Sequence, residues 1–134
     1  MPAALIGIYI AAVTNLARHE TKAHIPILAR IIPFLILTAA TVGFWKFSSM
    51  SPAAKPAIFF FAAAWLWALL LVIRIFKGTM PLPPIIGSHI RILLLLQAGL
   101  CWMGEPYEFG RWAAAVLTAC VPLSYLAAKK FYAS

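Results

Sequence analysis

Long apolar stretches separated by short polar segments run through the whole chain. The stretches cover residues 3–17, 25–45, 57–76, 85–103 and 112–128. An α-helix needs about 20 consecutive apolar residues to cross a hydrocarbon core about 30 Å thick. The last four stretches are therefore predicted to be membrane-spanning helices.

The first stretch, residues 3–17, leaves two possibilities open. At a rise of about 1.5 Å per residue it reaches only about 22 Å, so it either crosses a locally thinned bilayer or lies in the interface. It lacks the positively charged start and the Ala-x-Ala cleavage site of a signal peptide. We therefore expect it to be retained as part of the protein.

The connecting segments are short and rich in turn-forming residues. Residues 46–56 and 104–110 are expected to be polar loops, and the Pro-rich segment 78–84 is expected to be extended or turned. Within the second stretch, Pro33 should kink a helix or begin its regular part. These features predict an all-α integral membrane fold, a bundle of four to five short-looped transmembrane helices.

The chain is expected to form a single domain over residues 1–134. It divides into a first apolar segment with a cytoplasmic loop (1–24) and two helical hairpins (25–76 and 85–130). His24-Ile-Pro-Ile-Leu28 resembles His89-Ile-Arg-Ile-Leu93, which suggests that the hairpins are parallel repeats. A chance match in so apolar a chain is the alternative.

Composition excludes an ordinary soluble domain. Of the 134 residues, 64% are hydrophobic and 10% are charged, against about 45–50% and about 25% in soluble domains. The formal net charge is +8, but the basic residues stand singly or in pairs at the ends of the apolar stretches. This placement is typical of contact with anionic lipid headgroups, and we expect no nucleic-acid partner.

The distribution of basic residues predicts an orientation. With five spans, one side would carry Arg18, Lys22, Arg74, Lys77, Lys129 and Lys130, and the other Lys46, Lys55 and Arg111. The positive-inside rule places the first group, with the C-terminus, in the cytoplasm. The expected location is a bacterial inner membrane, with most interfacial aromatic residues on its outer side.

Two arginines are predicted to lie inside helices, each about 8 or 9 Å from the cytoplasmic end. Arg30 and Arg91 either extend to the interface or form a buried site for an anion, a lipid phosphate or a carboxylate of a partner. Arg74 and Lys77 would add positive charge on the same side. Because no acid of this chain is expected near them, a counter-charge would come from lipid, ligand or another chain.

Other candidate sites have weaker support in the pattern. His24 and His89, at the starts of two helices that run in the same direction, are compatible with ligation of haem b, although interfacial polar residues are the simpler interpretation. Glu105 and Glu108 could act as paired carboxylates on the outer side, or merely form a charged turn. No metal site and no nucleotide-binding or HExxH motif is predicted.

No set of residues converges on a catalytic mechanism, which argues against an enzyme. The chain is therefore expected to be a non-catalytic subunit or accessory factor of a larger membrane complex, in contact with other subunits or with copies of itself. The alternative is a homo-oligomeric transporter or channel for an anionic substrate. A haem-binding or lipid-modifying protein is a third possibility.

Overall fold

The computed structural model describes residues 2–18, 26–48, 55–78, 82–104 and 107–132. These residues form five α-helices and no strand, as the apolar pattern predicts. The helices are α1 (Pro2–Arg18), α2 (Ile27–Ser48), α3 (Lys55–Phe76), α4 (Leu82–Trp102) and α5 (Tyr107–Tyr132).

Four of the helices, α2 to α5, are long and apolar enough to cross a membrane. Helix α1 has 17 residues, which corresponds to about 25 Å at the usual helical rise. It is therefore shorter than the hydrocarbon core of a typical bilayer. The distinction between four long helices and one short one agrees with the sequence.

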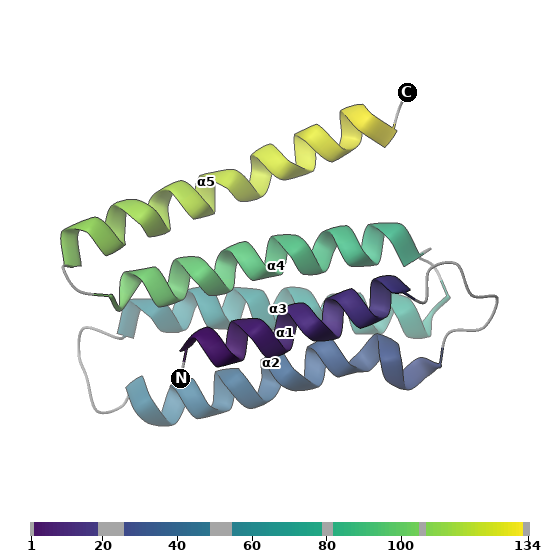
Figure 1. Cartoon of the computed structure of the whole chain (residues 1–134), viewed down its shortest axis with the longest axis horizontal. Helices are drawn as coiled ribbons and strands as arrows, with labels where there is room; N and C mark the ends of the chain where they lie inside the picture. Colours follow the sequence, from purple (N-terminus) through teal and green to yellow (C-terminus); the bar gives the residue numbers. More distant parts are fainter. Residues whose placement is uncertain (1, 19–25, 49–54, 79–81, 105–106, 133–134) are drawn as a thin grey trace.

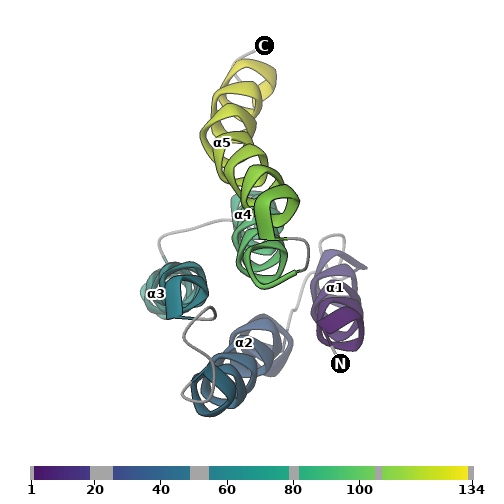
Figure 2. The same ribbon diagram turned by 90° about the vertical axis from the view of Figure 1, so that its left-hand side faces the viewer.

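The arrangement is a ring of four helices with a fifth on its outside. Seen along the helices, α1, α2, α3 and α4 surround a common core, and α5 lies beyond α4 (Figure 2). Contacts join α1 to α2, α2 to α3, α3 to α4 and α4 back to α1, whereas the substantial contacts of α5 are with α4. Successive helices run in opposite directions, and α5 diverges from α4 toward the C-terminus (Figure 1).

The interior of the ring is built on one face of α3. Its buried positions recur at intervals of three and four residues: Ala57, Phe61, Ala64, Ala68, Leu71 and Ile75. Such spacing places them on one side of a helix. Phe61 stacks on Phe44 of α2 at 4.3 Å between ring centroids, and a side chain at Gly99 of α4 would come within 3.0 Å of the Phe61 ring. The glycine therefore permits the close approach of α3 and α4.

Helices α4 and α5 both begin earlier than the sequence suggests. The prolines at 83 and 84 were expected to lie in a turn, but they lie in the first turn of α4, where the missing amide hydrogens would have no helical acceptor. Residues 107–110 were expected to belong to a loop, but they form the first turn of α5. Gly110 is buried there against α4, and a larger residue would not fit because a Cβ atom at this position would fall on the carbonyl oxygen of Cys101.

Helix α2 continues through Pro33, whose side chain is fully buried. The regular helix thus begins at Ile27 rather than at the proline. Across the α2–α3 contact, Nε1 of Trp65 donates a hydrogen bond of 3.0 Å to the hydroxyl of Thr38.

The two ends of the helices differ in character. Because successive helices run in opposite directions (Figure 1), the helix bounds place Arg18, Arg74, Lys77, Lys129 and Lys130 at one end, called the basic end below. The opposite end, the aromatic end, carries Lys46, Lys55 and Arg111 together with the exposed rings of Trp45, Phe59, Phe109 and Trp112. Aromatic rings of this kind are enriched where a membrane meets water.

Candidate functional site

His89 occupies an unexpected position. Because α4 begins at Leu82, His89 is seven residues into the helix, about 10 Å from its first residue. Its side chain is 1% exposed. The interpretation of His89 as an interfacial residue at a helix start is therefore wrong, since the histidine is part of the interior.

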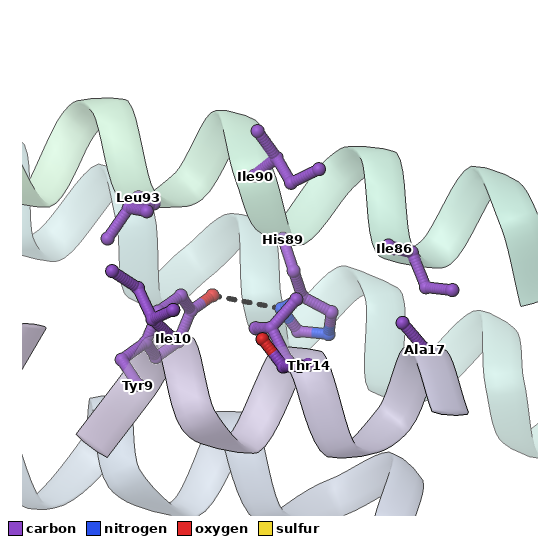
Figure 3. A pocket seen from close by; sticks show the side chains of 9 residues that line it. Tyr9, Ile10, Thr14, Ala17, Ile86, His89, Ile90 and Leu93 are labelled. Carbon is purple, nitrogen blue, oxygen red and sulfur yellow. Dashed lines mark hydrogen bonds between the residues drawn. The ribbon is translucent and has the colours of Figure 1, made fainter. Parts of the chain in front are cut away.

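A tyrosine from the first helix contacts this histidine. The hydroxyl of Tyr9 and Nδ1 of His89 are 2.9 Å apart, within hydrogen-bond distance, and the two rings meet edge to face at 6.1 Å. Tyr9 is also 1% exposed. The pair joins α1 to α4 across 80 positions of sequence, and Figure 3 shows the two side chains pointing toward one another.

The other nitrogen of His89, Nε2, is buried and has no hydrogen-bond partner among the described residues. When the hydroxyl of Tyr9 donates to Nδ1, Nε2 carries the hydrogen of the neutral ring and is the single group left without a partner. In the other tautomer Nδ1 donates, so the hydroxyl hydrogen of Tyr9 and the Nε2 lone pair would both lack partners. The first arrangement is preferred because a buried polar group without a partner is costly.

A pocket of about 220 Å³ lies beside this pair, between α1 and α4. Its polar lining consists of Tyr9, Thr14 and His89, and its apolar lining of Ile10, Val13, Ala17, Ile86, Ile90 and Leu93. No Lys, Arg, Asp or Glu contributes to it among the described residues. Nε2 of His89 faces the part of the pocket where Ala17 and Ile86 lie (Figure 3). The site therefore offers one directed hydrogen-bond donor in an uncharged, apolar setting.

Arg91 lies on the other side of α4 from His89, as their helical spacing predicts. Its Nε donates to the hydroxyl of Ser124 on α5 at 3.2 Å, and its guanidinium lies 5.4 Å from the centre of the Tyr125 ring. Counted from Leu82, Arg91 is about 13.5 Å into α4, deeper than the sequence suggested. The arginine is thus held by a hydroxyl and an aromatic ring of its own chain.

The remaining basic candidates lie elsewhere. Arg30 on α2 is half-buried, about 4.5 Å into its helix, and its Nε has no hydrogen-bond partner among the described residues. Arg74 and Lys77 are exposed at the end of α3. Neither Arg30 nor Arg91 lines the pocket, so binding of an anion at the arginines stays a prediction.

The haem and carboxylate predictions fall partly outside the described residues. His24 and Glu105 are not among them, so the histidine pair and the glutamate pair both stay predictions. Glu108 is exposed in the first turn of α5 rather than in a loop, where a negative charge stabilises the helix N-terminus. The described residues contain no group of three or more His, Cys, Asp or Glu side chains able to hold a metal ion.

Sequence reasoning found His89 but missed Tyr9. Tyr9 is the only aromatic residue in the apolar stretch 3–17, and a buried tyrosine usually finds a partner for its hydroxyl. That signal could have identified Tyr9 as a residue of interest. It could not have identified His89 as the partner, because the closure of α1 onto α4 is a property of the whole ring.

Comparison with known proteins gives no independent guide: no family model, no curated protein and no solved structure matches this chain.

Proposed function

We propose that this protein is an integral membrane protein in which α2 to α5 cross the bilayer and α1 completes the bundle. The aromatic end would lie at the outer interface and the basic end, with the C-terminus, in the cytoplasm of a bacterial cell. This orientation is supported by the larger number of basic residues at the basic end and by the exposed rings at the opposite end.

Within that membrane, we propose that the protein is a non-catalytic subunit of a larger assembly and that α5 is its docking helix. The observation that carries this proposal is the exposure of α5, which packs extensively against α4 but makes no other substantial contact. Only 6% of the residues in its apolar window are buried inside the protein, against 39% for α4. Its exposed face includes Val116, Leu123 and Leu126, a surface available to a helix of another chain.

Packing rather than hydrophobicity holds helices together in lipid, so an exposed apolar helix does not by itself require a partner. The small residues of α5 favour the packing of a partner helix against it. Residues 113–115 are three consecutive alanines, and Ala119 and Cys120 follow about one turn later. Small side chains allow close approach of a second helix backbone, and Ala115 and Ala119 are exposed.

The alternative of an anion transporter receives less support. Arg91, one of its two required residues, is held between α4 and α5 by Ser124 and Tyr125. Arg30 belongs to α2, which makes no substantial contact with α5. A shared anion path would need these two arginines on one water-filled surface.

The test is native mass spectrometry of the complex released from membranes in mild detergent. We expect the wild-type chain together with at least one further polypeptide. Val116→Trp, on the exposed side of α5, should release that partner because the larger side chain prevents close helix contact. Val42→Trp is the matched control, since Val42 is similarly exposed but lies on α2 (55% against 59%).

Retention of the partner in Val116→Trp would assign docking to another surface. Recovery of the wild-type chain as a monomer from gently solubilised membranes would contradict the proposal altogether. A mass equal to a multiple of this chain would identify the partner as a second copy.

A further inference from the structure

The pocket between α1 and α4 has properties that are separate from any role of α5. Its directed polar atom is Nε2 of His89, which is fully buried and without a partner among the described residues. A buried donor without an acceptor is rare and needs a specific explanation. A bound ligand that supplies the acceptor atom would explain it.

The lining determines the charge of that ligand. Apart from Tyr9, Thr14 and His89 the described lining is aliphatic, and no charged side chain contributes. An ionised carboxylate or phosphate placed here would lose its hydration without gaining a counter-charge. The ligand is therefore uncharged, and its acceptor is a carbonyl oxygen or an oxygen of similar strength.

The volume determines the size of the part that enters. An apolar cavity of about 150 Å³ in another protein accommodates benzene, so 220 Å³ accommodates one ring with a few substituents. Drug-sized ligands normally occupy about 300–1,000 Å³. Because the pocket lies between two helices of a chain proposed to lie in lipid, a long apolar tail can remain in the bilayer.

We propose that this pocket binds the head group of a lipid-soluble quinone. One carbonyl oxygen of the ring accepts a hydrogen bond from Nε2 of His89. The hydroxyl of Tyr9 holds the imidazole by donating to Nδ1, which keeps the hydrogen on Nε2. Because Nε2 has almost no accessible surface, the carbonyl oxygen reaches it by displacing the nearest lining side chains, Ala17 and Ile86 (Figure 3). The quinone ring contacts Ile10, Ile86 and Ile90, and the quinone tail extends along α1 and α4.

The proposal is tested by calorimetric titration of the purified protein in detergent with three compounds. Decylubiquinone carries a ring and carbonyl groups, decylbenzene a ring without a carbonyl, and methyl decanoate a carbonyl without a ring. We expect saturable binding of decylubiquinone, at least about tenfold tighter than of the other two, since each lacks one of the recognised features. Equal binding of decylbenzene would show that Nε2 has no role, and equal binding of methyl decanoate would assign the pocket to lipid esters. Either result overturns the proposal.

Two variants connect the binding to the pocket. His89→Leu removes the donor and should weaken decylubiquinone binding about tenfold or more. Ile90→Trp leaves His89 in place but fills the pocket from a half-exposed position, and it should abolish binding. Ile73→Trp is the control, because Ile73 is also partly exposed but belongs to α3 and does not line the pocket.

If His89→Leu does not fold, the comparison of Ile90→Trp with Ile73→Trp still decides the matter. Unchanged affinity in Ile90→Trp would place the binding site elsewhere and overturn the proposal. The same conclusion follows if the folded His89→Leu variant binds decylubiquinone as tightly as the wild-type chain.

Discussion

The ring of α1 to α4 and the outer helix α5 use apolar helices in opposite ways. Helix α1 is the shortest, yet it places Tyr9 and Leu16 fully in the interior. Helix α5 is the longest at 26 residues, yet the buried positions among its described side chains are Gly110 and Ala114. Length thus does not determine which helix forms the core.

The two regions also differ in what holds them together. Inside the ring, large side chains meet each other, as Phe44 and Phe61 do, and the buried pair of Tyr9 and His89 joins α1 to α4. At the α4–α5 contact, a glycine meets a backbone carbonyl near one end and Arg91 meets Ser124 near the other. We infer that the ring is the stable unit and that α5, whose substantial contacts are all with α4, packs on its outside.

The largest effect on the free energy of unfolding should come from a cavity in the core of the four-helix ring. Phe61→Ala removes a side chain that is 1% exposed and stacked on Phe44. We expect the free energy of unfolding to fall by about 3–5 kcal/mol, because a buried phenylalanine leaves a cavity that its neighbours fill only partly. The measurement is denaturation of the protein in detergent, followed by circular dichroism.

Two phenylalanines serve as controls for Phe61→Ala. Phe59 lies two residues away on the same helix but is 79% exposed, and Phe109 on α5 is 74% exposed. Replacing either with alanine should change the unfolding free energy by less than about 0.5 kcal/mol. A cost at Phe109 similar to that at Phe61 would show that α5 belongs to the stable unit after all.

The helices themselves could be predicted from the sequence because apolar stretches and their lengths are local properties. All five stretches became helices, and the four longest are those long enough to cross a membrane. Two helix starts were wrong because prolines in the first turn of α4 and glycines near the first turn of α5 were interpreted as loop signals. In each case the helix N-terminus tolerates what a helix interior would not.

The ring and its site could not be predicted in the same way. Helix α5 is the least hydrophobic of the four long helices, but a lower hydropathy does not by itself predict that a helix lies outside a ring. The partner of His89 is 80 residues away, and the distant contact depends on α1 closing the ring. The sequence did predict that His89 and Arg91 lie on different faces, because helical spacing is also a local property.

A glycine pair tests how tightly α5 is held at its first turn. Gly110→Ala places a methyl group on the carbonyl oxygen of Cys101, and the backbone there cannot give way without moving α5. We expect a loss of about 1–3 kcal/mol in unfolding free energy, the usual cost of overpacking. The measurement is again denaturation in detergent.

Gly43→Ala is the matched control and should change the unfolding free energy in the opposite direction. Gly43 lies within α2, and a Cβ atom there would have nothing within 4 Å. Alanine should stabilise the helix by about 0.5–1 kcal/mol, because glycine loses more backbone freedom on folding. If both variants were equally stabilising, the close contact between α4 and α5 at Gly110 would be refuted.

The smallest effect concerns the polar contact at the other end of the α4–α5 pair. A double-mutant cycle with Arg91→Leu and Ser124→Ala isolates the energy of the bond between the guanidinium and the hydroxyl. Hydrogen bonds between helices in lipid average about 0.6 kcal/mol and reach about 1.7 kcal/mol, so we expect a coupling in that range. Pairing Arg91→Leu with Thr118→Ala gives the control, because the Thr118 hydroxyl bonds to the carbonyl of Ala114 instead, and these two changes should be additive. A coupling near zero at Ser124 would mean that the hydroxyl does not hold Arg91, which would leave the Tyr125 ring and the Ser124 carbonyl as its contacts on α5.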